Sequence, residues 1–267
     1  MDLQDKTIVV TGGTSGIGRA MVERFAKERP RGIAVVGRNT EVAVAIAEQV
    51  DGVAITADLT SEAEVQRVIA ETEARFGPVD LFCSNAGFAQ PAGLESPDED
   101  WLHRWNIHVM AHVWAARTLV PAMAARGEGY LLNTASVGGL LMVPGDVPYT
   151  VTKHAAVALA ESLAVLYKGS GVRFSCLCPG VVETPMMATI DDSPVGRAVR
   201  AGGPSVEPEA VADAVVEGLR KEQFLILSQP EFQDLAVGRA ADWETYLDIL
   251  SGQWSAAGGT AFGISVR

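Results

Sequence analysis

The sequence predicts an α/β fold in which helices cover both faces of a seven-stranded parallel sheet. Short apolar runs rich in β-branched residues alternate with longer stretches of helical periodicity from the first residues onward, which is typical of a doubly wound sheet. The first run leads directly into a glycine-rich turn at residues 12–18 and then into a helical pattern. With 267 residues, 48% of them hydrophobic and 20% charged, the chain is long enough to bury one large core.

The expected strands are seven apolar runs separated by turn or helix signals. They are Thr7–Thr11, Ile33–Gly37, Val53–Ala57, Leu81–Ser84, Tyr130–Ala135, Val172–Cys178 and Phe224–Leu227. Helix starts are marked by Ser61 with Glu64, where a hydroxyl and a carboxylate would cap free amides reciprocally, and by Pro208 in a first turn. No repeat or linker rich in glycine, serine or proline divides the chain before residue 185, so residues 1–267 are expected to form a single domain.

Two stretches depart from this alternation of strands and helices. Residues 185–205 mix methionines with aspartates and glycines, and we expect them to form a lid over a substrate, with an ordinary surface loop as the alternative. Residues 231–267 form a C-terminal extension in which apolar residues recur at helical spacing. Such a helix would either cap the substrate cleft or pack on a neighbouring subunit.

Charge and composition exclude several classes of protein. A formal net charge of −12 with no basic run argues against a nucleic-acid partner, because phosphates attract clustered lysines and arginines. The chain begins without a basic segment followed by an apolar one, and no apolar window of about 18 residues is found. We therefore expect neither a membrane span nor a signal peptide. The expected location is cytoplasmic. The cysteines, Cys83, Cys176 and Cys178, are expected to be reduced and buried, and no metal site is expected.

The glycine-rich turn indicates a dinucleotide site. Glycines let a turn tighten and let the backbone approach a pyrophosphate, whose charge is favoured by the free amides of a helix N-terminus. The turn lies between a strand and a helix, which is the context that such a site requires. The residues expected to contact the cofactor here are Gly12, Thr14, Ser15, Gly16, Ile17 and Gly18.

The end of the second strand distinguishes the two nicotinamide dinucleotides. An acidic residue there bonds the free ribose hydroxyls of NAD, whereas a nearby arginine accommodates the 2′-phosphate of NADP. The sequence reads Gly37-Arg38-Asn39, with no carboxylate at this point. Arg38 therefore favours NADP, and NAD is the alternative. The other interpretation of Arg38 is a solvated surface charge.

Two further strand ends reach the same edge of the sheet. Asp58 and Leu59 follow the third strand, and Asp58 is expected to accept a hydrogen bond from the adenine amino group unless it serves only as a turn or N-cap residue. The fourth strand is followed by Asn85-Ala86-Gly87. These residues are small enough for close approach of a cofactor, and the amide of Asn85 would tie neighbouring strands together.

Tyr149 and Lys153 lie four residues apart at the start of a helical stretch and therefore share one helical face. A free tyrosine has a pKa of about 10, so its phenol can act as a base near neutral pH only if that pKa falls by about 3. A neighbouring ammonium supplies a field of the right sign. Ser136, thirteen residues before Tyr149 at the end of the fifth strand, would hold a substrate oxygen against the phenol.

Together these motifs resemble those of the short-chain dehydrogenase/reductase family over residues 5–228. The matching elements are Thr-Gly-x-x-x-Gly-Ile-Gly, Asn-Ala-Gly, a serine before Tyr-x-x-x-Lys, and Pro179-Gly180-Val181-Val182-Glu183-Thr184. The resemblance implies a Rossmann-type domain with strand order 3-2-1-4-5-6-7, catalysis by Ser136, Tyr149 and Lys153, and NAD or NADP at the carboxyl edge of the sheet. It also implies that Lys153 bonds the nicotinamide ribose and that Thr184 lies beside the carboxamide, with Pro179, Gly180 and Val182 in the same cofactor-binding segment.

One position departs from the family pattern. The family's fourth catalytic residue is usually an asparagine, and the spacing from Trp101 and from Pro121 places His108 there. Either this imidazole anchors a water in a relay that returns protons to Tyr149 through Lys153, or it is a buried histidine with satisfied hydrogen bonds. His112 lies one turn further on, without a third metal ligand.

The expected reaction is the reversible oxidation of a hydrophobic secondary alcohol to its ketone, with Tyr149 as general acid and base and the cofactor as hydride carrier. The alternatives are reduction of a 3-oxoacyl thioester and, in another class, a non-catalytic NAD(P)-binding regulatory protein. The expected pocket walls are mostly apolar: Phe88, Val137, Leu140, Leu141, Met142, Pro144, Met186 and Met187. A homodimer or homotetramer is expected, although the C-terminal extension differs from the family's usual ending.

Overall fold

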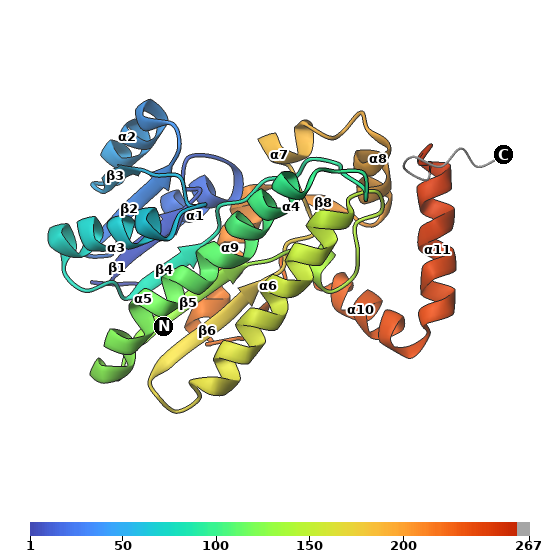
Figure 1. Ribbon diagram of the computed structural model, residues 1–267. Helices are drawn as coiled ribbons and strands as arrows, with labels where there is room; N and C mark the ends of the chain where they lie inside the picture. Colours follow the sequence, from blue (N-terminus) through green and yellow to red (C-terminus); the bar gives the residue numbers. More distant parts are fainter. Residues whose placement is uncertain (261–267) are drawn as a thin grey trace.

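A seven-stranded parallel sheet forms the centre of the computed structural model, which describes residues 1–260 (Figure 1). Its strands follow the order β3-β2-β1-β4-β5-β6-β9. They are β1 (Thr7–Thr11), β2 (Gly32–Gly37), β3 (Val53–Thr56), β4 (Leu81–Ser84), β5 (Gly129–Thr134), β6 (Val172–Leu177) and β9 (Leu225–Ile226). Since β9 is the seventh strand of this sheet, the expected order 3-2-1-4-5-6-7 is confirmed.

Helices cover both faces of the sheet, because its strands are apolar on both sides. One face carries α1 (Gly16–Ala26), α2 (Thr40–Gln49) and α9 (Pro208–Arg220), and the other carries α3 (Glu62–Phe76), α5 (Ala111–Arg126) and α6 (Val147–Leu166). Consecutive strand residues alternate between the two cores: Val10 packs with the first set of helices and Val9 with the second. The doubly wound architecture places every strand's carboxyl end at one edge of the sheet.

The helix-start signals were partly right. Pro208 is the first residue of α9, as expected. Ser61 is the N-cap residue of α3, but its hydroxyl makes no capping bond to the described backbone, so the reciprocal capping expected of Ser61 and Glu64 is wrong. The helix that carries Tyr149 begins earlier than expected, at Val147, and is capped by Asp146.

The long helix before β5 contains a π-helical turn. It begins as α4 (Asp98–Trp105), passes through the π-helix η1 (Asn106–Met110) and continues as α5. A π-helical turn inside an α-helix carries an extra residue and is frequent at functional sites. The periodicity of the sequence does not indicate this turn. The π-helical turn contains His108.

Residues 185–205 are ordered into short elements. They form α7 (Pro185–Ala188) and α8 (Pro194–Ala201), and β8 (Ser205–Val206) pairs in parallel with β7 (Val181–Val182) as a second, two-stranded sheet. Met187, Ile190 and Val195 pack together with Trp254 in a small core of their own. The segment is therefore more than a surface loop in structure.

The C-terminal extension consists of α10 (Glu231–Ala241) and α11 (Trp243–Ala256), which lie beyond α6 and α8 in Figure 1. Trp254 anchors α11: a Cβ at Gly145 would lie 2.3 Å from its ring, so only glycine leaves room for it there. None of the residues of α11 is buried, within the part of the chain that the structure describes. Residues 261–267 of the expected extension lie outside the described residues. No helix among residues 1–260 is long and apolar enough to cross a membrane.

Candidate functional site

The glycine turn lies at the carboxyl end of β1 and requires glycine at several positions. Gly12 and Gly16 have left-handed backbones, with φ of 66° and 50°, which favours glycine. A Cβ at Gly18 would lie 2.1 Å from the carbonyl oxygen of Gly12. The chain can make this turn, and pack α1 against it, only with these glycines.

The N-terminus of α1 is free to bind an anion. Ser15 is the N-cap residue, and its hydroxyl makes no capping bond to the first turn in the described structure, so the first amides of α1 have no side-chain partner. Thr184 lies against the turn from the opposite side, 3.1 Å from where a Cβ of Gly16 would lie. A pyrophosphate fits this arrangement, because its charge is favoured by helix amides and by the helix dipole.

Arg38 is exposed at the carboxyl end of β2. It lines an open depression together with Asn39, Thr40 and Glu41, and Asn39 caps α2 by accepting from the amide of Val42 at 3.1 Å. Among the residues described, the Arg38 guanidinium has neither a hydrogen bond nor an ion pair to another side chain. It is therefore available to a ligand.

Asp58 serves as a turn residue, which was the alternative interpretation of it. One of its oxygens accepts from the amide of Thr60 at 3.1 Å and from the Thr60 hydroxyl at 2.9 Å. These bonds, and to a smaller degree the charge of Arg38, hold the pKa of the Asp58 carboxyl below its usual value. Asp58 is also exposed at the cofactor edge, whereas its neighbour Leu59 is buried.

Asn85 links β4 to β1, which confirms the expected role of its amide. Its Nδ2 donates to the carbonyl of Thr11 at 3.0 Å. The Thr11 hydroxyl accepts from the amides of Asn85 and Ala86, at 2.7 and 3.0 Å, and donates to the carbonyl of Cys83 at 2.9 Å. The segment is thus fixed beside the glycine turn. Gly87 lies close to His108, because a Cβ at Gly87 would be 3.2 Å from the His108 ring.

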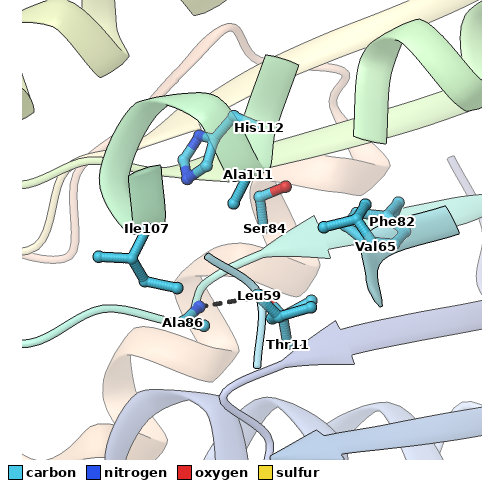
Figure 2. Close-up of a pocket in the computed structure, with 9 residues that line it drawn as sticks. All are labelled: Thr11, Leu59, Val65, Phe82, Ser84, Ala86, Ile107, Ala111 and His112. Atoms are coloured by element: carbon cyan, nitrogen blue, oxygen red, sulfur yellow. Dashed lines mark hydrogen bonds between the residues drawn. The ribbon is translucent and has the colours of Figure 1, made fainter. Parts of the chain in front are cut away.

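A small cavity of about 10 Å³ lies between β4 and α5, behind Ala86. It has room for about one water and is too small for a substrate. The Ser84 hydroxyl and the Nδ1 of His112 are buried there and have no hydrogen-bond partner within residues 1–260. Burial lowers the pKa of His112 to about 3, so the ring is neutral. Figure 2 shows the lining residues, Thr11, Leu59, Val65, Phe82, Ser84, Ala86, Ile107, Ala111 and His112.

Ser136, Tyr149 and Lys153 meet at the carboxyl end of β5. Ser136 caps the short helix η2 (Val137–Gly139), where its hydroxyl accepts from the amide of Gly138 at 3.0 Å. A Cβ at Gly138 would lie 3.4 Å from Ser136 Oγ and 3.5 Å from Tyr149 Cε1. The Lys153 ammonium donates to the carbonyl of Thr134 at 3.1 Å and lies 5.6 Å from the centre of the Tyr149 ring. The structure therefore brings together the three residues that the sequence selected.

Burial disfavours the charged forms of both Tyr149 and Lys153. It raises the pKa of Tyr149 to about 12, although a hydrogen bond with Ser136 acts in the opposite direction. It lowers the pKa of Lys153 to about 8. A phenolate at this position therefore requires additional positive charge near the ring.

His108 is fully buried beside Tyr149, and both of its ring nitrogens have protein partners. Nε2 accepts from the amide of Phe88 at 3.3 Å, and Nδ1 lies 3.0 Å from the hydroxyl of Thr152. Burial, followed by the charge of Lys153, holds the pKa of His108 well below its usual value. The ring is therefore neutral, and a relay water held by it would have to displace one of these bonds.

Three residues near Tyr149 were missed by the sequence analysis: Arg104, Asp146 and Thr152. Asp146 accepts from the amide of Tyr149 at 3.2 Å, and Arg104 lies 3.6 Å from the same carboxylate oxygen. Burial raises the pKa of Asp146 to about 6, against the opposing effect of the Arg104 charge. An aspartate followed by a proline two residues later is an N-cap signal, which was available in the sequence.

The expected pocket walls differ in their exposure. Leu141 and Met187 are buried, and Met187 belongs to the core of residues 185–205. Met186 is 38% exposed. Phe88 lies under the Arg104 guanidinium, 5.2 Å from it, and 5.5 Å from the His108 ring. Each arginine in this region bonds one backbone carbonyl: Arg104 that of Gln90, and Arg239 that of Leu140.

The chain is similar in sequence to known dehydrogenases. The family model for short chain dehydrogenases matches residues 6–194. A 1-deoxy-11-beta-hydroxypentalenate dehydrogenase of Streptomyces exfoliatus is 36% identical over 242 residues, which cover 86% of this chain and 86% of that protein.

Two solved structures share the fold over most of their length. A short chain dehydrogenase/reductase from Burkholderia phymatum in complex with NAD has a TM-score of 0.83 and 27% identity, covering 92% of this chain and 96% of that one. L-sorbose reductase from Gluconobacter frateurii, complexed with NADPH and L-sorbose, has a TM-score of 0.74 and 28% identity, covering 85% of this chain and 97% of that one.

Proposed function

The chain belongs to the short-chain dehydrogenase/reductase family, and on that premise we propose that Tyr149 is the proton donor and acceptor of its reaction. As a member of this family the protein is an oxidoreductase that interconverts a secondary alcohol and its ketone with a nicotinamide dinucleotide. The observation that carries the proposal is the convergence of three side chains: Ser136 and Tyr149 meet at Gly138, and the Lys153 ammonium lies 5.6 Å from the centre of the Tyr149 ring.

In the direction of reduction, the Tyr149 phenol donates its proton to the oxygen of the carbonyl. Ser136 donates a hydrogen bond to the same oxygen. In the structure its hydroxyl accepts from the amide of Gly138 at 3.0 Å and donates to the carbonyl of Pro179 over a long 3.5 Å, a bond that a substrate oxygen would replace. Lys153 lies 5.6 Å from the centre of the phenol ring, where its positive charge would favour the phenolate form of Tyr149. The nicotinamide dinucleotide supplies the hydride.

NADP is the proposed cofactor. Two observations support this choice. Arg38 is exposed at the end of β2 and unpaired among the described residues, and the end of β2 carries no carboxylate to bond the free ribose hydroxyls of NAD. The two solved structures bind NAD and NADPH respectively, so the choice depends on the residues of this chain.

The remaining cofactor contacts are assigned by their place along the carboxyl edge. The glycine turn would hold the pyrophosphate, Asp58 and Leu59 the adenine, and Asn85, Ala86 and Gly87 the middle of the molecule. Pro179, Gly180, Val182 and Thr184 would flank the nicotinamide, with Lys153 at its ribose. Support for this end comes from the packing of Thr184 against Gly16.

A hydrophobic substrate is proposed on the evidence of the walls. Residues 137–144, which follow Ser136, are all apolar or glycine, and Arg104 and Arg239 each bond a backbone carbonyl. Residues 185–205 would act as a lid within a single domain of 267 residues. A cytoplasmic location and a homodimeric or homotetrameric assembly stay part of the proposal.

The test is turnover by the purified protein with NADPH or NADH and a panel of cyclic and linear ketones. Replacement Tyr149→Phe removes the phenolic proton and should lower kcat by about 100-fold or more, the usual contribution of a general acid. Tyr130→Phe is the matched control, because the Tyr130 hydroxyl is also buried but bonds Ser175, at 2.7 Å, in the body of the sheet. Near-wild-type turnover by Tyr149→Phe would show that the assignment is wrong.

A further inference from the structure

The backbone of Tyr149 is bonded on both sides by side chains of its own helix. Its amide donates to Asp146 Oδ1 at 3.2 Å. Its carbonyl oxygen accepts from the Thr152 hydroxyl at 3.1 Å, and the same hydroxyl lies 2.9 Å from the carbonyl of Pro148. The position of this one residue is therefore determined by two side chains as well as by the helix.

Each of these side chains is contacted in turn by a basic residue of the preceding helix. Arg104, in α4, lies 3.6 Å from Asp146, and His108, in the π-helical turn, lies 3.0 Å from Thr152. All four side chains are buried, with exposed fractions between 0% and 2%. Contacts this deeply buried have no competition from water.

The direction of the hydrogen bonds through His108 follows from its partners. The amide of Phe88 donates to Nε2, so the proton of the neutral ring is on Nδ1. Nδ1 then donates to the Thr152 hydroxyl, and the hydroxyl proton is left for the carbonyls of Tyr149 and Pro148. The chain of bonds runs from the segment after β4 to the backbone of Tyr149.

We propose that Arg104 and His108 are positioning residues, which act through Asp146 and Thr152 to hold the Tyr149 phenol in its reactive orientation. Neither forms a hydrogen bond to the phenolic oxygen among the contacts of residues 1–260, and His108 also lies edge-on to the Tyr149 ring, with 5.6 Å between the ring centres. Their effect is therefore on the orientation of the phenol and not on proton transfer itself. This proposal rests on the proposed role of Tyr149. It differs from a relay, because the two nitrogens of His108 serve protein groups.

The substitution that tests it is Thr152→Val, which keeps the shape of the side chain and removes the hydroxyl. A catalytic group displaced by about 1 Å loses up to 10²-fold in rate, and we expect kcat to fall about tenfold with the KM of the cofactor unchanged. Thr152→Ser keeps the hydroxyl and should restore kcat. Thr72→Val is the matched control: Thr72 is fully buried in α3 and donates to the carbonyl of Val68 at 2.7 Å, so its loss should lower the Tm and leave kcat unchanged.

A double-mutant cycle with His108→Phe tests whether His108 acts through Thr152. If the two residues act through one bond, the double variant should lose the same tenfold as each single variant; independent effects would multiply to about 100-fold and would overturn the proposal. Wild-type kcat in Thr152→Val, or a loss confined to the KM of the cofactor, would also overturn it.

The two proposals fail in different ways. Turnover by Tyr149→Phe contradicts the assignment of Tyr149, whereas an inactive Tyr149→Phe together with a fully active Thr152→Val contradicts only the positioning role. If His108→Phe does not fold, the comparison of Thr152→Val, Thr152→Ser and Thr72→Val still decides whether the Thr152 hydroxyl positions Tyr149, and wild-type kcat in Thr152→Val still overturns the proposal.

Discussion

Arg104 and Asp146 form an ion pair in which each side chain is only 2% exposed, with 3.6 Å between Nη1 and Oδ1. The pair joins α4 to the first turn of α6, because Asp146 is the N-cap residue of α6. Arg104 also donates to the carbonyl of Gln90, and the amide of Val147 donates to the carbonyl of Ala92 at 3.0 Å. A buried charge pair and the loop after β4 thus fix the start of the helix that carries Tyr149.

Removing one member of this pair should destabilise the protein in a pH-dependent way. Arg104→Met leaves the Asp146 carboxylate buried without its counter-charge, which typically costs about 3–5 kcal/mol. The pKa of Asp146, already raised to about 6, should rise further. A raised folded-state pKa gives stability that is present at low pH and lost as pH rises through that pKa, so the deficit of the variant should be small at pH 5 and full at pH 8.

Denaturant unfolding at both pH values measures this deficit. Arg173→Met is the control, because the Arg173–Glu222 pair is exposed at 46% and 44% and such pairs contribute at most about 1 kcal/mol. Equal losses in the two variants at pH 8 would contradict the account of the Arg104–Asp146 pair.

Lys153 should be a residue that weakens the fold while serving the site. Its pKa is about 8, against an ordinary 10.5. The charged form of Lys153 is therefore less favourable in the folded protein than in water by about 3 kcal/mol. Lys153→Met should therefore raise stability at pH 7 and abolish turnover. The advantage should shrink as pH rises from 8 to 10.5, because a lowered folded-state pKa means that folded Lys153 becomes neutral before the unfolded residue does.

Thermal unfolding at pH 7 and pH 10, together with an activity assay, decides this prediction. Lys221→Met replaces a lysine that is 60% exposed and should change neither the Tm nor the turnover much. A lower Tm of Lys153→Met at pH 7 would show that the bond to the Thr134 carbonyl outweighs the cost of burying the charge.

Local signals in the sequence were sufficient for the strands and the reactive residues. A buried parallel strand appears in the sequence as an apolar run. The glycines at 12, 16 and 18 appear as a pattern directly after the first such run, and the structure shows that side chains there would clash or be strained. Arg104 and Thr152 gave no such signal, because their burial depends on how α4 and α6 meet. The π-helical turn is also invisible to a helical period of 3.6 residues, and β7 and β8 are only two residues long.

Arg200 should control the opening of residues 185–205. It bonds both carboxylate oxygens of Glu183, at 2.7 and 3.0 Å, and also bonds Asp191, so it ties α8 to β7 and to the turn between α7 and α8. Arg200→Met should raise the rate of amide hydrogen exchange across residues 185–205 and raise the KM of the substrate several-fold, because closure over the substrate would become less favourable.

The matched control is Arg67→Met, since Arg67 bonds Glu64 and Glu71 in the same manner on α3. This variant should leave exchange in residues 185–205 and the substrate KM unchanged. Unchanged exchange in Arg200→Met would mean that the small core around Met187 and Val195 holds the segment by itself.

Arg38 should determine the preference for NADPH. A hydrogen bond to a charged group contributes about 1.5–3 kcal/mol, so Arg38→Leu should weaken NADPH about tenfold or more and leave NADH little changed. Arg31→Leu is the control, because Arg31 directly precedes β2, at the opposite end of the same strand. The measurement is the ratio of the two cofactor KM values in each variant. Equal weakening of both cofactors would mean that Arg38 bonds a group that they share, and the proposed choice of NADP would then lose its support.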